Sequence, residues 1–323
     1  MKIGIADNNG LKFCQDLKEH WEKKGHEVKY ERGASEYLAQ WADLYYVDQA
    51  DNNVAYLYKL YHGDTDVSRP PDWDNRKKPI IAVRALDWDI WIRHTTGNQE
   101  IVDWVDKWIC IAPHLEKELR RHADFDPPAG GKLKIIRPGV NLEKFTLKVK
   151  KTDGFQLGMV LGDMWWPKNH MAGLDIFTTL YRQDNRWRFH IRGQHEEGTD
   201  YWKIMYEYYL DSRGIREAVT LYSQLENMNS WYENIDILLH PGMKEGFCYA
   251  IGEAMAKGIP AVINDFYGSE DIWKGFTYQT HEQVINIINT RLFANPEANR
   301  NFIKSIYSLE RQLKETDEWL GIP

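Results

Sequence analysis

Short apolar runs alternate with amphipathic stretches along most of this chain, and this alternation limits its possible folds more than any other feature. The stretch from Leu11 to Trp21 has helical spacing, as do Asn53–Tyr61 and Pro113–His122. Strands that alternate with helices indicate βαβ units and a parallel sheet. The strands expected in the first half are Ile3–Ala6, Val28–Tyr30, Leu44–Val47, Ile80–Val83, Trp108–Ile111 and Lys134–Ile136.

A second series of the same kind follows the polar, basic stretch Leu147–Asp153. Its expected strands are Phe155–Leu161, Arg188–Ile191, Val219–Tyr222, Ile235–Leu239 and Ala261–Ile263. Its expected helices are Met171–Tyr181, Tyr201–Ser212, Met228–Glu233 and Cys248–Lys257, with helical material from His281 to Trp319. The 323 residues suffice for two cores.

We therefore predict an α/β protein with two Rossmann-like domains, 1–147 and 154–300. The remaining segment, 301–323, is helical and could pack back on the N-terminal domain. Ligands of open α/β sheets bind at the carboxyl ends of the strands, so a cleft between the domains is the expected site.

Composition narrows the class of protein. Hydrophobic residues make up 43% and charged residues 28%, as in globular proteins, and no apolar stretch approaches the roughly 20 residues of a membrane span. The first residues run directly into a strand pattern, without a signal peptide, which favours a cytoplasmic location. The three cysteines are far apart, which argues against disulfides and a structural zinc site. The net charge of −7 gives no support for a nucleic-acid partner.

The segment most informative about function is the window His240–Asp265, HPGMKEGFCYAIGEAMAKGIPAVIND. An apolar strand ends at its start, a loop with Gly246 follows, and a new helix then opens. A glycine lets the backbone approach a ligand closely, and the first turn of a helix offers free N–H groups and a positive dipole end. This combination suits a diphosphate. Glu245 would stand just outside the phosphates, and Glu253 could accept hydrogen bonds from ribose hydroxyls.

The same window resembles the E-x7-E signature of the retaining glycosyltransferases of family 4, which have the GT-B fold. The two glutamates are Glu245 and Glu253, in EGFCYAIGEAMAKGIPAV. The stretch Asp106–Phe145 resembles the end of the family's N-terminal domain, and Leu157–His170 resembles its first C-terminal strand and phosphate loop. The resemblance implies that Lys168 contacts the donor diphosphate.

The residue roles below follow from this resemblance. The catalytic candidates are Glu245, which would orient the donor sugar, and Lys168, which would stabilise the leaving group. The donor-binding candidates are Glu253, Gly246, Phe247, Cys248, Gly10, Arg192 and Gly193. The nucleotide base is expected near Gly193 and residues 223–225. Weaker candidates for acceptor binding are Trp88, Trp91 and His94 in the N-terminal domain.

The chain also departs from the family pattern. Asp163 stands where many members have an arginine five residues before the lysine, so another cation would be needed; Arg192, Arg137 and Lys244 are candidates. No catalytic histidine can be assigned after the strand Ile80–Val83. We expect a UDP- or GDP-sugar as substrate and no metal. Four Asp-x-Asp patterns, beginning at residues 64, 72, 87 and 124, are frequent by chance in an acidic chain.

The expected activity is transfer of a sugar from a nucleotide-diphosphate donor to a hydroxyl, with a glycan or lipid-linked saccharide as acceptor. The alternatives are glycosylation of hydroxylated bases in phage DNA, a GT-B phosphorylase or epimerase, and a nucleotide-sugar-binding module without turnover. Lys77–Lys78 and Lys148–Lys151 could touch DNA phosphates, although such charge runs usually face solvent.

Overall fold

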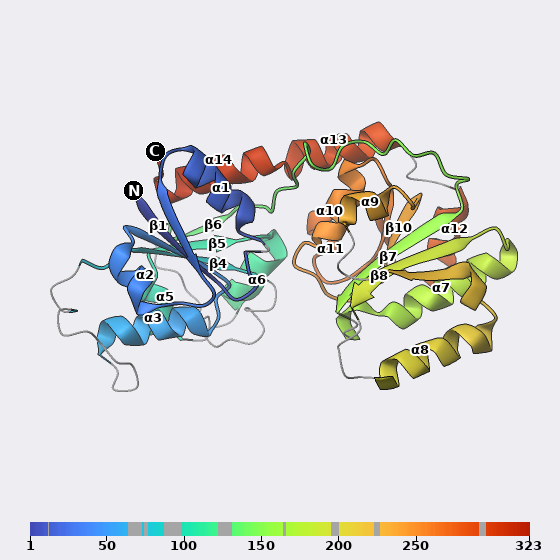
Figure 1. The fold of residues 1–323 in the computed structure, drawn as a ribbon, viewed down its shortest axis with the longest axis horizontal. Helices are drawn as coiled ribbons and strands as arrows, with labels where there is room; N and C mark the ends of the chain where they lie inside the picture. Colours follow the sequence, from blue (N-terminus) through green and yellow to red (C-terminus); the bar gives the residue numbers. More distant parts are fainter. Residues whose placement is uncertain are drawn as a thin grey trace. The chain divides into compact units, whose positions relative to one another are not determined.

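The alternating apolar runs form two six-stranded parallel sheets, one in each of two units of the chain (Figure 1). The first unit is Met1–Pro138 with Glu310–Pro323, and the second is Gly139–Leu309. The computed structural model describes residues 1–11, 13–63, 73, 77–86, 98–121, 131–163, 166–194, 200–222, 227–290 and 295–323.

The sheet of the first unit has six parallel strands, and the first strand of the chain lies second from one edge. The strands, in sheet order, are β2 (Glu27–Glu31), β1 (Lys2–Asp7), β3 (Leu44–Asp48), β4 (Ile80–Ala85), β5 (Lys107–Cys110) and β6 (Leu133–Ile135). All five residues of β3 are buried, as expected of a parallel strand between two helical layers. The register is set by pairs such as Ile3 with Val28 and with Leu44.

Helices cover both faces of this sheet. They are α1 (Gln15–Lys23), α2 (Glu36–Trp41), α3 (Asn52–His62), α5 (Gln99–Trp104), α6 (Pro113–Arg121) and α14 (Leu309–Leu320). Leu17 and Trp21 of α1 share one core with Leu320, at the end of α14. Figure 1 shows α1 and α14 side by side on one face of the sheet, and α2, α3 and α5 on the other.

A buried carboxylate fixes α14 to α1. Asp317 of α14 accepts a hydrogen bond from Nε1 of Trp21 at 2.9 Å, and its other oxygen lies 3.0 Å from Nζ of Lys24 and 2.7 Å from Nε2 of His20. Burial acts to raise the pKa of Asp317, but the hydrogen bonds from these three partners outweigh it and hold the pKa below its usual range.

The sheet of the second unit has β7 and β10 at its centre. The strands, in sheet order, are β12 (Thr277–Tyr278), β11 (Ala261–Asn264), β10 (Ile237–His240), β7 (Gln156–Asp163), β8 (Arg188–Gln194) and β9 (Val219–Tyr222). The helices are α7 (His170–Gln183), α8 (Asp200–Arg213), α9 (Met228–Tyr232), α10 (Tyr249–Ala256), α11 (Ser269–Ile272), α12 (His281–Thr290) and α13 (Pro296–Ile306), with 3-10 turns at Trp166–Lys168 and Arg216–Ala218.

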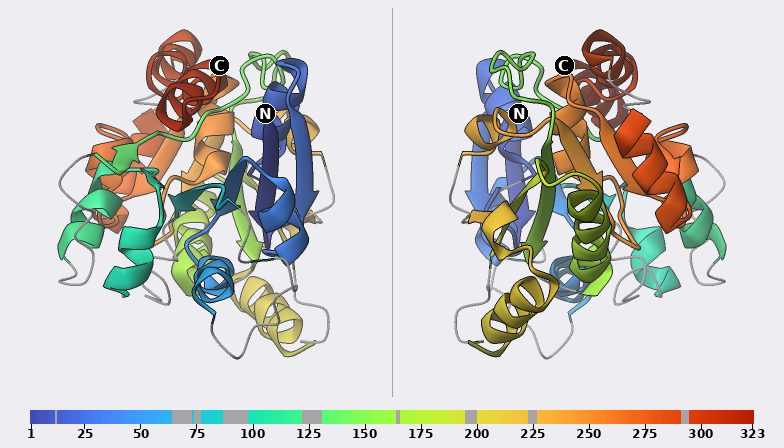
Figure 2. Two further views of the ribbon diagram at one scale, coloured as in Figure 1. Left: turned by 90° about the vertical axis from the view of Figure 1, so that its left-hand side faces the viewer. Right: turned by 90° about the vertical axis from the view of Figure 1, so that its right-hand side faces the viewer.

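Two helical layers enclose this second sheet (Figure 2). Apolar side chains of α7, α8 and α12 form one core with β7, β8 and β10, in which Phe177 stacks on Phe189 at 4.8 Å between ring centroids. Helix α10 lies on the other face, against β10, β11 and α13. Within the described ranges, no helix is long and apolar enough to cross a membrane.

The predicted fold class is confirmed, since both series of apolar runs form parallel sheets with helices on their faces. The short elements α11 and β12 were missed, because four and two residues are too few to show a period.

The basic stretch before β7 does not simply face solvent, because several of its groups bind to carboxylates of the same unit. Lys148 lies 3.2 Å from Asp236, and backbone N–H groups of Val149 and Lys150 donate to Glu233.

Candidate functional site

The central loop of the second unit runs from the carboxyl end of β10 to the start of α10. His240 is the last residue of β10, and α10 begins at Tyr249. Two contacts hold the loop in place: the N–H of Met243 donates to the carbonyl of Pro167 at 2.8 Å, and Nδ2 of Asn264 donates to the carbonyl of Gly242 at 3.1 Å. The loop is therefore fixed against the segments that follow β7 and β11.

Both helices that begin beside this loop have N-caps in the left-handed region. Cys248 precedes α10 with φ 63°, and Asn169 precedes α7 with φ 49°; neither side chain makes a capping hydrogen bond. The first-turn N–H groups of a helix have no intrahelical acceptor, and the helix dipole adds positive potential there. Two such ends near Lys168 make this region suited to an anion.

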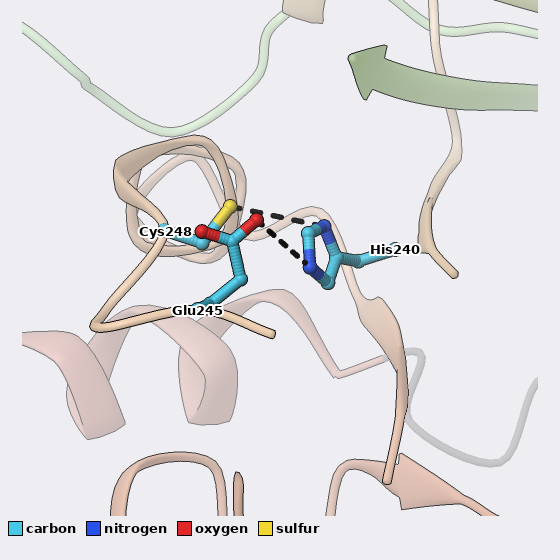
Figure 3. A group of neighbouring side chains, drawn as sticks. All are labelled: His240, Glu245 and Cys248. Carbon is cyan, nitrogen blue, oxygen red and sulfur yellow. Dashed lines mark hydrogen bonds and ion pairs between the residues drawn. The ribbon is translucent and has the colours of Figure 1, made fainter. Parts of the chain in front are cut away.

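Lys168 and Glu245 form an ion pair between Nζ and Oε1, which links the 3-10 turn after β7 to the loop after β10. The two side chains are 27% and 11% exposed, so the pair is reachable from solvent while Glu245 is largely enclosed. Oε1 of Glu245 also lies 3.4 Å from Nε2 of His240 (Figure 3). The two residues predicted to be catalytic are thus brought together, in a direct contact that the sequence did not predict.

His240 is buried between Glu245 and Cys248. Burial, with a smaller contribution from the positive charge of Lys168, lowers the pKa of His240 to about 3, so its imidazole is neutral. A Cβ at Gly242 would lie 2.6 Å from Nε2 of His240, so the ring fits only because that neighbour is glycine. Sγ of Cys248 lies 3.8 Å from Nδ1 of His240. Burial raises the pKa of the Cys248 thiol to about 12, and Glu245 adds to the effect.

Glu253 lies on α10, one turn after its start, and is held by a buried tyrosine. The hydroxyl of Tyr232 on α9 is 3.0 Å from Oε2 of Glu253 and 3.0 Å from the carbonyl of Ala250. Burial, reinforced by the charge of Glu253, raises the pKa of Tyr232 far above its usual range. The hydroxyl is therefore protonated and donates, and the carboxylate of Glu253 is its stronger acceptor.

Of the three candidates for the second cation, Arg192 has a charge that acts on Tyr232, as the charge of Glu253 does. It stands at the carboxyl end of β8 and is 8% exposed. Burial raises the pKa of Tyr232, and the positive charge of Arg192 opposes this effect. Gly193 follows it on the same strand and is partly buried. Lys244 is a partly buried neighbour of Glu245 in the loop, whereas Arg137 belongs to the first unit.

Phe247 fixes the loop through its ring. The ring is 3% exposed and lies 5.0 Å, between centroids, from both Trp273 and Tyr307. Gly246 beside it is buried. Phe247 thus has a packing role, and its side chain is not exposed to a ligand. A Cβ at Gly252 would lie 2.8 Å from Val140, so α10 packs closely on that residue.

In the first unit, Gly10 lies in a loop that folds around a carboxylate. The oxygens of Asp7 accept hydrogen bonds from the backbone N–H groups of Asn9 and Leu11, at 2.7 and 2.9 Å. Gly10 lies between them with φ 70° and is exposed. The two flanking N–H groups are therefore bound to Asp7, a contact that the Asn-Asn-Gly turn pattern does not predict.

Several predicted positions lie outside the described residues. These are the acceptor candidates Trp88, Trp91 and His94, residues 223–225, and the four Asp-x-Asp patterns. Asp163 is placed in β7, but its side chain is not described.

Sequence reasoning missed His240 and Tyr232. A histidine that ends a central parallel strand was one available signal, because such ends line ligand sites in α/β sheets. Tyr232 gave no signal, since an aromatic residue on a short amphipathic helix is usually packed in the core.

Most of the second unit matches a described protein family. Residues 156–306 match the family model "Glycosyl transferases group 1". D-inositol 3-phosphate glycosyltransferase from Paenarthrobacter aurescens is 24% identical over 190 residues, which are 54% of this chain and 45% of that protein. The chain spans about half the length of the curated relatives it matches.

Solved structures share the fold of the whole chain. HepE from Anabaena, in complex with UDP and glucose, superposes with a TM-score of 0.72 at 14% identity and covers 100% of both chains. Sucrose-phosphate synthase from Thermosynechococcus elongatus has a TM-score of 0.74 at 12% identity, over 98% of each chain. The fold is thus GT-B, as predicted.

Proposed function

Because residues 156–306 match the glycosyl transferases group 1 family, we propose that this chain transfers a sugar from a nucleotide-diphosphate donor to an acceptor hydroxyl. The donor would bind to the second unit, where Lys168, Glu245 and Glu253 surround the start of α10.

One arrangement carries this proposal: the Lys168–Glu245 ion pair stands beside the start of α10, and Glu253 follows one turn along that helix. A diphosphate needs cations and N–H donors, and a ribose or hexose needs carboxylate acceptors for its hydroxyls. Both kinds of group occur here, on the 3-10 turn after β7, in the loop after β10 and in the first turns of α10.

In the proposed reaction the acceptor oxygen forms a bond to the anomeric carbon while the bond from that carbon to the diphosphate breaks. Lys168 would move from Glu245 to the departing phosphate, where negative charge develops, and the α10 amides would share that charge. Glu245 would then hold donor hydroxyls. Retention of configuration follows if the acceptor proton passes to the departing phosphate on the same face.

We propose a UDP-sugar as donor, since HepE was solved with UDP and glucose, and a glycan or lipid-linked saccharide as acceptor. Nothing in the described contacts favours DNA as an acceptor. Lys148 is paired with Asp236, and Lys78 lies 2.8 Å from Asp106, so these two lysines are bound to carboxylates of their own chain.

The test is a donor screen that measures release of nucleoside diphosphate and thermal shift with UDP-glucose, UDP-N-acetylglucosamine and GDP-mannose. We expect one donor to give both signals and Glu253→Ala to lose both. Glu297→Ala, an exposed glutamate of the same unit, is the matched control and should keep both signals. A thermal shift without turnover of any donor would support the binding module instead. An unchanged Glu253→Ala response would contradict the proposed site.

A further inference from the structure

Three potential metal ligands of different chemistry converge at the carboxyl end of β10 (Figure 3). One ligand atom each from His240, Glu245 and Cys248 lies within 4.8 Å of the others. Nε2 of His240 lies 3.4 Å from Oε1 of Glu245, and its other ring nitrogen, Nδ1, lies 3.8 Å from Sγ of Cys248. Ligands of a tetrahedral Zn²⁺, at about 2.0 to 2.3 Å from the ion, stand about 3.3 to 3.7 Å apart. One imidazole nitrogen must face both other ligands, so the ligand atoms, now within 4.8 Å of one another, would have to close by up to about 1 Å to reach such a geometry.

The imidazole supplies a second, independent observation. His240 is 3% exposed, and its Nε2 makes no hydrogen bond within the described part of the chain, although it faces Glu245. The other ring nitrogen, Nδ1, has the thiol of Cys248 as its partner at 3.8 Å. Buried polar atoms are normally satisfied, and one that is not requires an explanation such as a missing ion.

We propose that His240, Glu245 and Cys248 bind a thiophilic divalent cation of the Zn²⁺ class, and that this cation competes with Lys168 for Glu245. Imidazole, thiolate and carboxylate together are a ligand set of Zn²⁺, whereas Mg²⁺ and Ca²⁺ take oxygen ligands. Three protein ligands leave a fourth position for water or another small ligand.

The charges at this site explain why the cation and Lys168 compete for Glu245. In the free protein the ammonium group of Lys168 neutralises Glu245. When the cation binds, Cys248 loses its thiol proton to solvent, and two anionic ligands neutralise the two positive charges. Lys168 then loses its ion pair with Glu245 and is repelled by the cation. A bound cation would also withdraw Glu245 from the donor sugar and slow transfer, a consequence that rests on the proposed function.

A second cluster of this kind among the described residues, Asp7, Cys14 and Asp48, is less suited to a cation. Asp48 is paired with Arg84 at 2.5 Å, deep in the first unit. Asp7 accepts from two backbone N–H groups. A divalent ion there would have to displace a buried arginine and those bonds, so Cys14 serves as a control.

The experiment is titration of the full chain with Co²⁺, a spectroscopic substitute for Zn²⁺, without donor. We expect one equivalent to give thiolate-to-cobalt charge-transfer absorption, which added Zn²⁺ abolishes. Cys248→Gly should lose this absorption; the variant should fold, since φ 63° favours glycine. Cys14→Ala and Cys110→Ala should keep it. No absorption in the wild type, or absorption that persists in Cys248→Gly, would overturn the site.

The competition has its own test in the same titration. Lys168→Ala should bind Co²⁺ at least tenfold more tightly than the wild type, because Glu245 is then unpaired, whereas Lys18→Ala, at a surface pair of the first unit, should not. Unchanged or weaker binding in Lys168→Ala would refute the competition. Since no donor is present, these results are independent of the donor screen, and failure of one proposal leaves the other standing.

Discussion

Replacement of Tyr232 by phenylalanine tests how Glu253 is positioned. Tyr232 is fully buried, and its hydroxyl is 3.0 Å from the carboxylate of Glu253. The change removes one oxygen and leaves the ring in place. Because Glu253 is only partly buried, its carboxylate can then rotate away from the orientation that a ribose would meet. We therefore expect the loss to appear in donor affinity rather than in the chemical step.

The magnitude follows from the type of bond that is lost. A hydrogen bond to a charged group contributes about 1.5 to 3 kcal/mol. If the bond acts wholly by ordering Glu253 for the donor, the dissociation constant for UDP should rise about 10- to 150-fold, since about 1.4 kcal/mol corresponds to a factor of ten. Part of the lost free energy lowers the folding stability instead of the donor affinity, so we expect the dissociation constant for UDP to rise about tenfold.

The assay is isothermal titration calorimetry with UDP, combined with steady-state kinetics with the donor identified in the screen. The Michaelis constant for the donor should rise while kcat changes little. Tyr278→Phe, a buried tyrosine in the core of the same unit, is the matched control and should bind UDP as the wild type does. If Tyr232→Phe binds UDP within twofold of the wild type, or loses kcat alone, the positioning role is refuted.

Three further predictions concern stability in urea. Cys248→Gly should change the free energy of unfolding by less than about 1 kcal/mol, because relief of the left-handed strain offsets the lost side-chain contacts; a loss above 2 kcal/mol would show that the thiol packs more tightly than described. Asp317→Asn should cost about 2 kcal/mol at pH 7. The folded-state pKa of Asp317 is below the unfolded value, so its contribution is present above pH about 4 and is lost as the pH falls through the folded pKa; a difference that does not shrink at all as the pH falls below about 4 would contradict this. Gly158→Ala should cost about 1 to 3 kcal/mol, since its Cβ would lie 2.5 Å from Ile235, and an unchanged midpoint would refute that.

The fold could be predicted from the sequence because its evidence is local. Ile3–Ala6, Ile235–Leu239 and similar runs are short, apolar and separated by amphipathic stretches, and that pattern leaves few arrangements other than parallel sheets. The loop before α10 was located correctly for the same reason, since His240-Pro241-Gly242 ends a strand and the helical period resumes after it.

The contacts within the site could not be predicted in this way. Lys168 meets Glu245 across 77 positions of the chain, and Tyr232 meets Glu253 across 21. Such pairs depend on how neighbouring loops are placed at one edge of the sheet. Local sequence patterns do not predict that placement. The loop around Asp7 illustrates the same point: Asn-Asn-Gly indicates a turn, but not that a buried carboxylate binds its N–H groups.

The most direct test of the central claim is hydrogen exchange of the second unit with and without a saturating UDP-sugar. We predict slower deuterium uptake in the peptide that spans residues 243–254, because the amides at the start of α10 would bind the diphosphate and Glu253 the ribose. The peptide that covers α13 (Pro296–Ile306) should exchange as before. If a donor saturates the protein, as shown by calorimetry on the same sample, and exchange in residues 243–254 is unchanged, the donor does not bind at this site.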